Sequence, residues 1–302
     1  MNRTAEFVSP KHPDKLCDRI SDIILDYCLT RDPNSRVAVE VQGGHGFINI
    51  NGEITTNIKE ELPINDLVEQ VVGKEYRIQV KLIQQSPEIS RGVDTGGAGD
   101  QGIMVGYACG ENDEYMPEEY RLARDLCRHI YNVYRYDGKT QVTLDTNKNI
   151  IAIVCSFQNA KREQLEQLIT EWLDYKVDGI EMYCNPAGDW EQGGFDADAG
   201  LTGRKLVVDN YGPRVPIGGG AYSGKDPSKV DRSAAYMARH IAVKELKDKQ
   251  LKECWVYLSY AIGRKEPLQA TVKVRTQTNT FGSYDLPDEY SVQPNDIIKE
   301  LD

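Results

Sequence analysis

Three glycine-rich loops, and the charges around them, are the parts of this sequence best suited to chemistry. The loops span residues 96–102 (GGAGDQG), 193–205 (which ends in GLTGRK) and 218–226 (GGGAYSGKD). Glycine lets backbone N–H groups come close to phosphate oxygens. Residues 204–232 carry six Lys or Arg against three Asp, although the whole chain has a formal net charge of −11. Each loop taken singly is better explained as a tight turn, but a basic glycine-rich segment in an acidic chain favours a polyphosphate site.

The third loop does not form a P-loop. Gly219 to Lys225 fits the spacing GxxxxGK, but Asp226 stands where Ser or Thr should supply a hydroxyl for magnesium. Pro216 also interrupts the apolar segment before the loop, where a buried strand would be needed. The P-loop class of nucleotide hydrolases is therefore excluded.

Two carboxylates could supply the metal ligands. Asp14 follows His12 and Pro13 at the expected start of a helix, and Asp231 lies in the first turns of another. Magnesium bound together with a polyphosphate takes one or two carboxylates, and phosphate oxygens and water complete its shell. For each Asp taken alone, a favourable place near a helix N-terminus is the better explanation.

Length and composition restrict the class of protein. The chain has 302 residues, enough for about two domains or one large unit. Its acidity argues against binding to nucleic acid or to an anionic membrane, and no apolar run is long enough to span a bilayer. The seven cysteines are widely spaced without a CxxC pair, and the N-terminus lacks the apolar stretch of a signal peptide. We expect a cytoplasmic protein with reduced thiols.

Hydrophobic periodicity predicts an α+β fold. Helical spacing of apolar residues predicts helices over residues 14–29, 119–134, 163–173 and 228–246. Alternation predicts strands over residues 37–41, 78–82, 255–262 and 270–276. The helices are too few to cover both faces of one parallel sheet, so we expect mixed or antiparallel sheets with helices on one face. The order strand, strand, long helix recurs about three times.

Seven collinear motifs in residues 7–265 resemble those of one enzyme family, the S-adenosylmethionine synthetases (methionine adenosyltransferases). The segment 12–22 (HPDKLCDRISD) is similar to the opening motif of that family, and GAGDQG and GGGAYSGKDPSKVDR are similar to its two signatures. The other matching segments are GEITT at 52–56, QSP at 85–87, GLTGRK at 200–205 and LSYAIG at 258–263.

The resemblance implies an enzyme that transfers the adenosyl group of ATP to the sulfur of L-methionine and then cleaves the triphosphate to pyrophosphate and phosphate. It also implies three similar subdomains about a pseudo-threefold axis, here placed at 1–88, 89–191 and 192–302, the last with a truncated tail. Further implications are Mg²⁺, with two ions per site, K⁺, and a homodimer with shared active sites, for which a tetramer is the alternative assembly.

Residue roles follow from the same resemblance. It implies a catalytic role toward the triphosphate for His12, Arg204, Lys205 and Lys225. Further ATP-binding positions are Asp100, Asp137, Lys139, Trp190, Asp198 and Ala221. Methionine would contact Glu53, Gln85, Asp198 and Lys229. Asp14 and Asp231 would hold Mg²⁺, and Glu40 would hold K⁺.

The chain departs from the family pattern by being shorter. The segment before His12 is compressed, the gating loop after Gln85 is reduced, and the sequence stops at a segment (293–302) that resembles the late helix of the family. Two alternatives remain beside the complete synthetase. One is a paralogue that keeps only triphosphate cleavage or uses another acceptor, and the other is an inactive partner subunit. The presence of Glu53, Gln85 and Lys229 favours methionine as acceptor.

Overall fold

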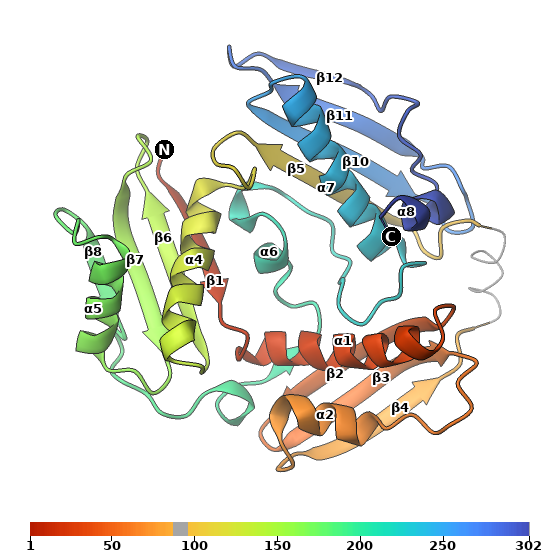
Figure 1. Ribbon diagram of the computed structural model, residues 1–302, viewed down its shortest axis with the longest axis horizontal. Helices are drawn as coiled ribbons and strands as arrows, with labels where there is room; N and C mark the ends of the chain where they lie inside the picture. Colours follow the sequence, from red (N-terminus) through yellow and green to blue (C-terminus); the bar gives the residue numbers. More distant parts are fainter. Residues whose placement is uncertain (87–95, 302) are drawn as a thin grey trace.

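Three four-stranded sheets with helices packed on them make up the fold, in a computed structural model that describes residues 1–86 and 96–301 (Figure 1). The first sheet has the order β4-β3-β2-β9 and carries two helices. Its elements are β2 (Arg36–Gly44), β3 (Phe47–Thr55), β4 (Arg77–Ile83), β9 (Gly200–Leu201), α1 (Pro13–Arg31) and α2 (Ile64–Val72).

The second and third sheets have the same size and a similar cover of helices. The second, in the order β1-β6-β7-β8, is built from β1 (Arg3–Val8), β6 (Gly138–Leu144), β7 (Ile150–Phe157), β8 (Glu181–Cys184), α4 (Glu118–Val133) and α5 (Arg162–Trp172). The third, in the order β12-β11-β10-β5, is built from β5 (Gly102–Cys109), β10 (Glu253–Tyr260), β11 (Gln269–Arg275), β12 (Phe281–Asp285), α7 (Val230–Asp248) and α8 (Pro294–Leu301). Short helices η1 (Gly194–Asp196), α6 (Leu206–Asp209) and η2 (Gly212–Arg214) connect them.

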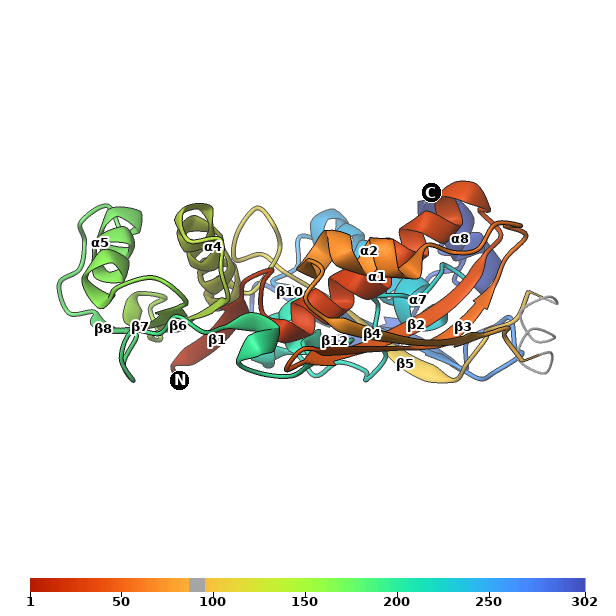
Figure 2. The same ribbon diagram turned by 90° about the horizontal axis from the view of Figure 1, so that it is seen from below.

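The predicted fold class is confirmed: the sheets are mixed or antiparallel, and the helices lie on one side of the layer that the sheets form (Figure 2). Each sheet is completed by one strand from a distant part of the chain. β9 joins the first sheet, β1 the second and β5 the third. The three sheet-and-helix units surround the segment that contains α6 (Figure 1). The proposed division of the chain at 88/89 and 191/192 stays a prediction.

Helix α1 forms where the sequence supplies both a cap and an apolar stripe. Pro13 occupies the first turn, where its missing N–H costs nothing, and His12 Nδ1 accepts a hydrogen bond from the Asp14 N–H. Ile20 and Ile24 are fully buried against the inward side chains of β2. Side chains alternate between the two faces of a strand. Every second residue of β2 and β3, including Glu40 and Glu53, therefore lies on the face of the sheet that no helix covers.

The four long helices and the four strands expected from the periodicity are all present, with ends that differ by a few residues. The seven cysteines are all buried free thiols, as expected. Among the described helices, none has the length and apolar character needed to cross a bilayer. The gating loop after Gln85 falls on residues 87–95, outside the described residues.

Glycine at position 106 is required by the close approach of β5 to α7. A Cβ atom at Gly106 would lie 1.9 Å from the carbonyl oxygen of Ala238, a backbone atom that cannot move aside alone. We therefore expect Gly106→Ala to lower the free energy of unfolding by about 3 kcal/mol, as for a severe overpacking change. Gly282→Ala is the matched control, because its Cβ would meet only Val274 Cγ2 at 3.6 Å. Chemical denaturation measures both, and equal stability of the two variants would contradict this packing.

Candidate active site

The outer edge of β2 holds two of the three glycine loops by main-chain hydrogen bonds. At one end, β9 pairs with Gln42 and Gly43. At the other end, Val39 N donates to Gly224 O (3.0 Å), and Asp226 N donates to Val37 O (3.0 Å). The GLTGRK segment and the end of the GGGAYSGKD loop are thereby aligned along one strand.

Asp226 shows why the third loop is not a P-loop. Its carboxylate is buried and accepts hydrogen bonds from Val37 N (2.7 Å), Ser228 N (2.9 Å) and Lys229 Nζ (3.2 Å). The residue therefore anchors the loop to β2, where a P-loop would place a hydroxyl on magnesium.

Three aspartates on one stripe of α1 accept hydrogen bonds from the same two loops. Asp14 Oδ1 accepts from Leu201 N (3.0 Å), Asp18 Oδ1 from Gly203 N (2.8 Å) and Asp22 Oδ1 from Gly224 N (3.0 Å). The spacing i, i+4, i+8 places these carboxylates above one another on the helix. Asp18 and Asp22 were not among the predicted site residues, although their spacing from Asp14 was visible in the opening motif.

Two consecutive cations meet at Asp14. Its carboxylate is fully buried and contacts Arg204 Nε at 2.8 Å and Lys205 Nζ at 2.5 Å. Burial alone would raise the pKa of Asp14, but the hydrogen bonds from Lys205 and the Leu201 amide and the two positive charges hold it below its usual value. Asp14 is therefore a carboxylate at neutral pH, and the Arg204 side chain beside it is half exposed.

His12 is a neutral hydrogen-bond donor in this group. Burial and the nearby charges of Lys205 and Lys139 lower its pKa to about 4. Because Nδ1 accepts from the Asp14 N–H, the neutral ring carries its proton on Nε2. With Nδ1 occupied and Nε2 protonated, His12 can donate its Nε2–H to a ligand, but it has no free lone pair with which to act as a base.

Further predicted nucleotide-binding residues lie near His12 or beside the 193–205 loop. The Asp198 carboxylate raises the pKa of His12 and the Lys139 ammonium lowers it, so both charges are close to the ring. Asp137, whose pKa burial raises, accepts a hydrogen bond from Gly194 N at 3.0 Å. The Trp190 ring packs beside Gly193, where a Cβ would lie 2.8 Å from it. This set, with Asp14, Arg204 and Lys205, is called the His12 group below.

A second group of predicted residues lines a cavity of about 280 Å³. Six of the predicted residues line it: Glu53, Gln85, Asp100, Lys225, Lys229 and Asp231. Lys225 Nζ lies 2.6 Å from Asp231 Oδ2. Within the described part of the chain, the buried Gln85 Oε1 has no hydrogen-bond donor. This set, the Lys225 group, offers charges of both signs and one unused acceptor.

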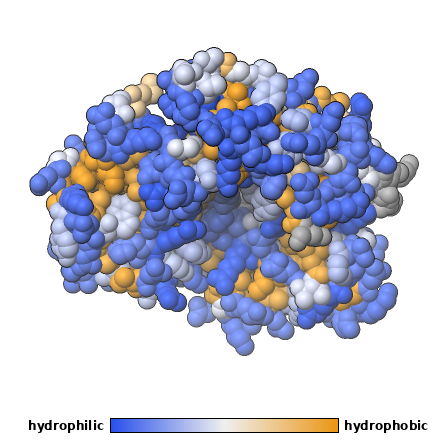
Figure 3. Space-filling view, turned by 45° about the horizontal axis from the view of Figure 1, so that its top comes forward, coloured by the Kyte–Doolittle hydropathy of each residue, from blue (hydrophilic) through white to orange (hydrophobic). Residues whose placement is uncertain are grey.

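The two groups remain separate within one chain. No hydrogen bond or ion pair among residues 1–86 and 96–301 joins the His12 group to the Lys225 group. Ala221 lies against the first, because a Cβ at Gly203 would meet its Cβ at 2.4 Å. Glu40 lies exposed on the uncovered face of β2, two residues from Ala38, which bridges to Lys225. The face seen in Figure 3 is mostly hydrophilic and is hollowed near its middle.

The comparisons with known proteins identify the family. Three family models match nearly the whole chain: the N-terminal (residues 1–90), central (95–190) and C-terminal (192–302) domains of S-adenosylmethionine synthetase. S-adenosylmethionine synthases of a Nitratiruptor species and of Clostridium tetani are 40% and 39% identical, over 99% of this chain and 88% and 89% of their own. The chain belongs to the S-adenosylmethionine synthetase family.

A solved structure supports the same assignment. An unusual S-adenosylmethionine synthetase from Campylobacter jejuni matches with a TM-score of 0.86 and 34% identity, over 99% of this chain and 88% of that one. The first of these sequence alignments extends over 347 positions for a chain of 302 residues, so that relative has segments that this chain lacks. The family resemblance and the shortened chain expected from the sequence are both confirmed.

The lowered pKa of His12 predicts an acid-dependent loss of stability. Between pH 6.5 and about 4 the unfolded chain binds a proton on this ring that the folded chain does not, so acid favours unfolding over this range. We expect the free energy of unfolding of the unmodified protein to fall, relative to His12→Asn, by about 3 kcal/mol over this range. Denaturant titrations at pH 7, 5.5 and 4 measure it, and parallel pH profiles for the two proteins would refute it.

Proposed function

We propose that this chain is an active methionine adenosyltransferase that joins the adenosyl group of ATP to the sulfur of L-methionine. The observation that carries the proposal is that two loops bearing cations of the His12 group and of the Lys225 group are held along one edge of β2. The His12 group offers two adjacent cations and a neutral N–H donor, as a polyphosphate requires. The Lys225 group offers charges of both signs, as an amino acid requires.

The cavity lined by the Lys225 group suits the polar end of methionine. Lys229 is the cation for the α-carboxylate, and Glu53 is the carboxylate for the ammonium group. The unused Oε1 of Gln85 would accept one further N–H from the ammonium group. Truncation of this set would be expected in a paralogue that had changed its acceptor.

The reaction needs no general base. The thioether sulfur attacks C5′ with a lone pair, the C5′–O bond breaks, and the triphosphate takes the electron pair as it leaves. Sulfur has no proton to lose, which agrees with a His12 ring that has no free lone pair. The rate then depends on alignment of sulfur with C5′ and on stabilisation of the leaving charge by Arg204, Lys205 and Lys225. Water subsequently hydrolyses the triphosphate to pyrophosphate and phosphate.

The carboxylates fit a role in holding Mg²⁺ with the phosphates. Asp231 Oδ2 engages Lys225, and a Cβ at Gly220 would lie 2.2 Å from Oδ1, so glycine leaves space beside this oxygen. Asp14 offers the second carboxylate. Among the described residues no three His, Cys, Asp or Glu gather into a site, which suits an ion that also takes phosphate oxygens. When bound, Mg²⁺ would neutralise negative charge on the triphosphate. For K⁺, the proposed ligand is the Glu40 carboxylate.

A homodimer would bring the two groups together. Among the described residues of one chain no hydrogen bond or ion pair joins them, yet one ATP must reach both the polyphosphate cations and the methionine pocket. The uncovered side of the sheets presents Lys139, Glu40 and Glu53, and a second copy of the chain could face them there.

Seven buried free thiols agree with a reducing compartment such as the cytoplasm.

A product assay tests the function. Incubation with ATP, Mg²⁺, K⁺ and L-methionine is expected to yield S-adenosylmethionine, pyrophosphate and phosphate together. Lys225→Met should lower kcat by at least a hundredfold, because a cation at the leaving group is lost, while Lys74→Met, an exposed lysine, should not. Cleavage of added triphosphate without S-adenosylmethionine would indicate the paralogue, and no turnover would indicate an inactive partner subunit.

The proposed metal role of Asp231 makes a separate prediction. Asp231→Asn removes one charged oxygen ligand, so the Mg²⁺ concentration for half-maximal activity should rise at least tenfold. Asp248→Asn, an exposed carboxylate on the same helix, serves as the control. An unchanged Mg²⁺ titration in an active Asp231→Asn enzyme would show that Asp231 is not a ligand.

A further inference from the structure

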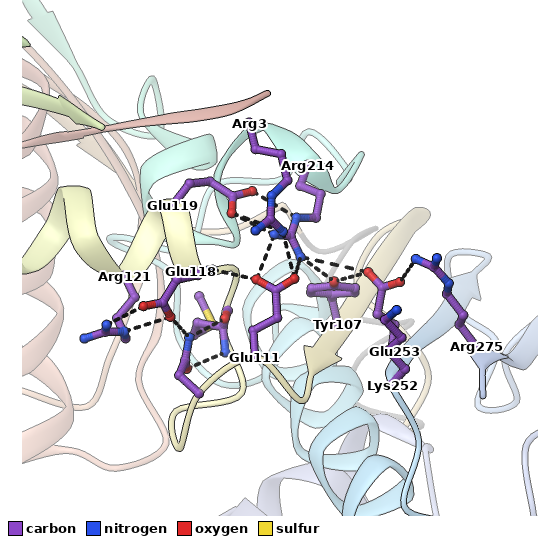
Figure 4. A network of polar contacts seen from close by, with 12 residues as sticks. Arg3, Tyr107, Glu111, Glu118, Glu119, Arg121, Arg214, Lys252, Glu253 and Arg275 are labelled. Atoms are coloured by element: carbon purple, nitrogen blue, oxygen red, sulfur yellow. Dashed lines mark hydrogen bonds and ion pairs between the residues drawn. The ribbon is translucent and has the colours of Figure 1, made fainter. Parts of the chain in front are cut away.

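A cavity of about 560 Å³, which shares no lining residue with the His12 group or the Lys225 group, lies between the second and third units. Arg3 of β1 and the turn between β6 and β7 form one wall, and the ends of β5, β10 and β11 form the other. Five cationic side chains and two carboxylates line it. Figure 4 shows part of this lining, with Arg3, Arg214 and Arg275 converging on the carboxylates.

The two carboxylates of the lining are already satisfied by the protein. Arg214 forms two hydrogen bonds of 3.0 Å to Glu111, and Arg3 Nη1 adds a third at 2.7 Å. Glu253 accepts from the Tyr107 hydroxyl at 2.6 Å and from Arg275 Nη1 at 2.9 Å. A ligand would therefore meet paired carboxylates whose repulsion is largely offset.

Two lysines beside this network of ion pairs carry positive charge that no carboxylate of the described residues neutralises. Lys148, on the β6–β7 turn, contacts no carboxylate within the described residues, and Lys252 Nζ donates only to the neutral Asn279 side chain, at 2.9 Å. Arg275 Nε has no acceptor among the described residues. The Arg275 side chain lines the cavity and is 31% exposed, but Nε itself is buried, so this N–H reaches a ligand only when the guanidinium turns toward the cavity.

We propose that this cavity binds a small inorganic polyanion of the phosphate or pyrophosphate type. Two ammonium groups and a guanidinium N–H suit a ligand with several charged oxygens. No aromatic side chain is among the described lining residues, so a nucleobase would find no ring to stack on. This argues for an inorganic ion over a nucleotide. The proposal is independent of the adenosyl transfer proposed above.

Equilibrium dialysis of labelled pyrophosphate at physiological ionic strength tests the site. We expect the unmodified protein to bind one equivalent more per chain than Lys148→Gln/Lys252→Gln, or to bind that equivalent at least tenfold more tightly. Lys74→Gln/Lys176→Gln removes the same charge from exposed positions elsewhere and should bind as the unmodified protein does. Equal binding by the Lys148/Lys252 variant, or an equal loss in the control, would overturn the proposal.

A third variant separates a built site from general attraction. Arg275→Lys keeps the charge but loses the Nε–H, so pyrophosphate affinity should fall several-fold, and unchanged affinity would count against the site. Stronger competition by AMP than by phosphate for the same equivalent would overturn the inorganic class. Turnover of the Lys148→Gln/Lys252→Gln variant should match the unmodified enzyme. If no variant makes S-adenosylmethionine, the proposed function fails and the binding count still decides this site.

Discussion

Hydrogen bonds from backbone N–H groups to three aspartates of α1 are the interaction on which the candidate site depends. A buried carboxylate is costly unless donors satisfy it, so Asp14 and Asp18, both almost fully buried, can persist only with their partners in place. Those partners are the Leu201 and Gly203 amides together with the Arg204 and Lys205 cations at Asp14 and the Lys15 cation at Asp18. The helix therefore selects one position for the loop, and with it the direction in which Arg204 and Lys205 leave the main chain.

The edge of β2 adds a second, independent constraint to the same loops. Main-chain hydrogen bonds to β2 set the position of each loop along the strand. The aspartates of α1 hold the same loops at the side of the sheet that the helix covers. Gly200 is needed at this junction, because a Cβ there would lie 2.2 Å from the Pro13 carbonyl oxygen. Glycine in these loops thus serves close packing of strand against helix as well as any approach of phosphate. The positions of Arg204, Lys205 and Lys225 are therefore fixed by contacts of their loops with α1 and β2, and not by the loops alone.

Much of this could be predicted from the sequence, for physical reasons that also explain the omissions. Helices such as α1 and α7 carry an apolar stripe of full length, which periodicity detects. β5 was missed because small residues, Gly106 and Ala108, stand where a typical strand has branched residues, and the close approach of α7 requires the glycine. The exchange of β1, β5 and β9 between sheets could not be foreseen, since pairing of distant segments leaves no local pattern.

The same distinction applies to the site. Family motifs predicted which residues gather, and His12, Asp14, Arg204 and Lys205 do gather. They did not predict that His12 is a neutral donor, because its low pKa arises from burial and from the charges of Lys205 and of Lys139, which lies on another sheet. The positioning roles of Asp18 and Asp22 also depend on tertiary contacts, although their helical spacing was visible. Because these anchors lie on α1 and β2 and not in connecting loops, a shorter chain can lose loop segments and still hold its charged groups in place.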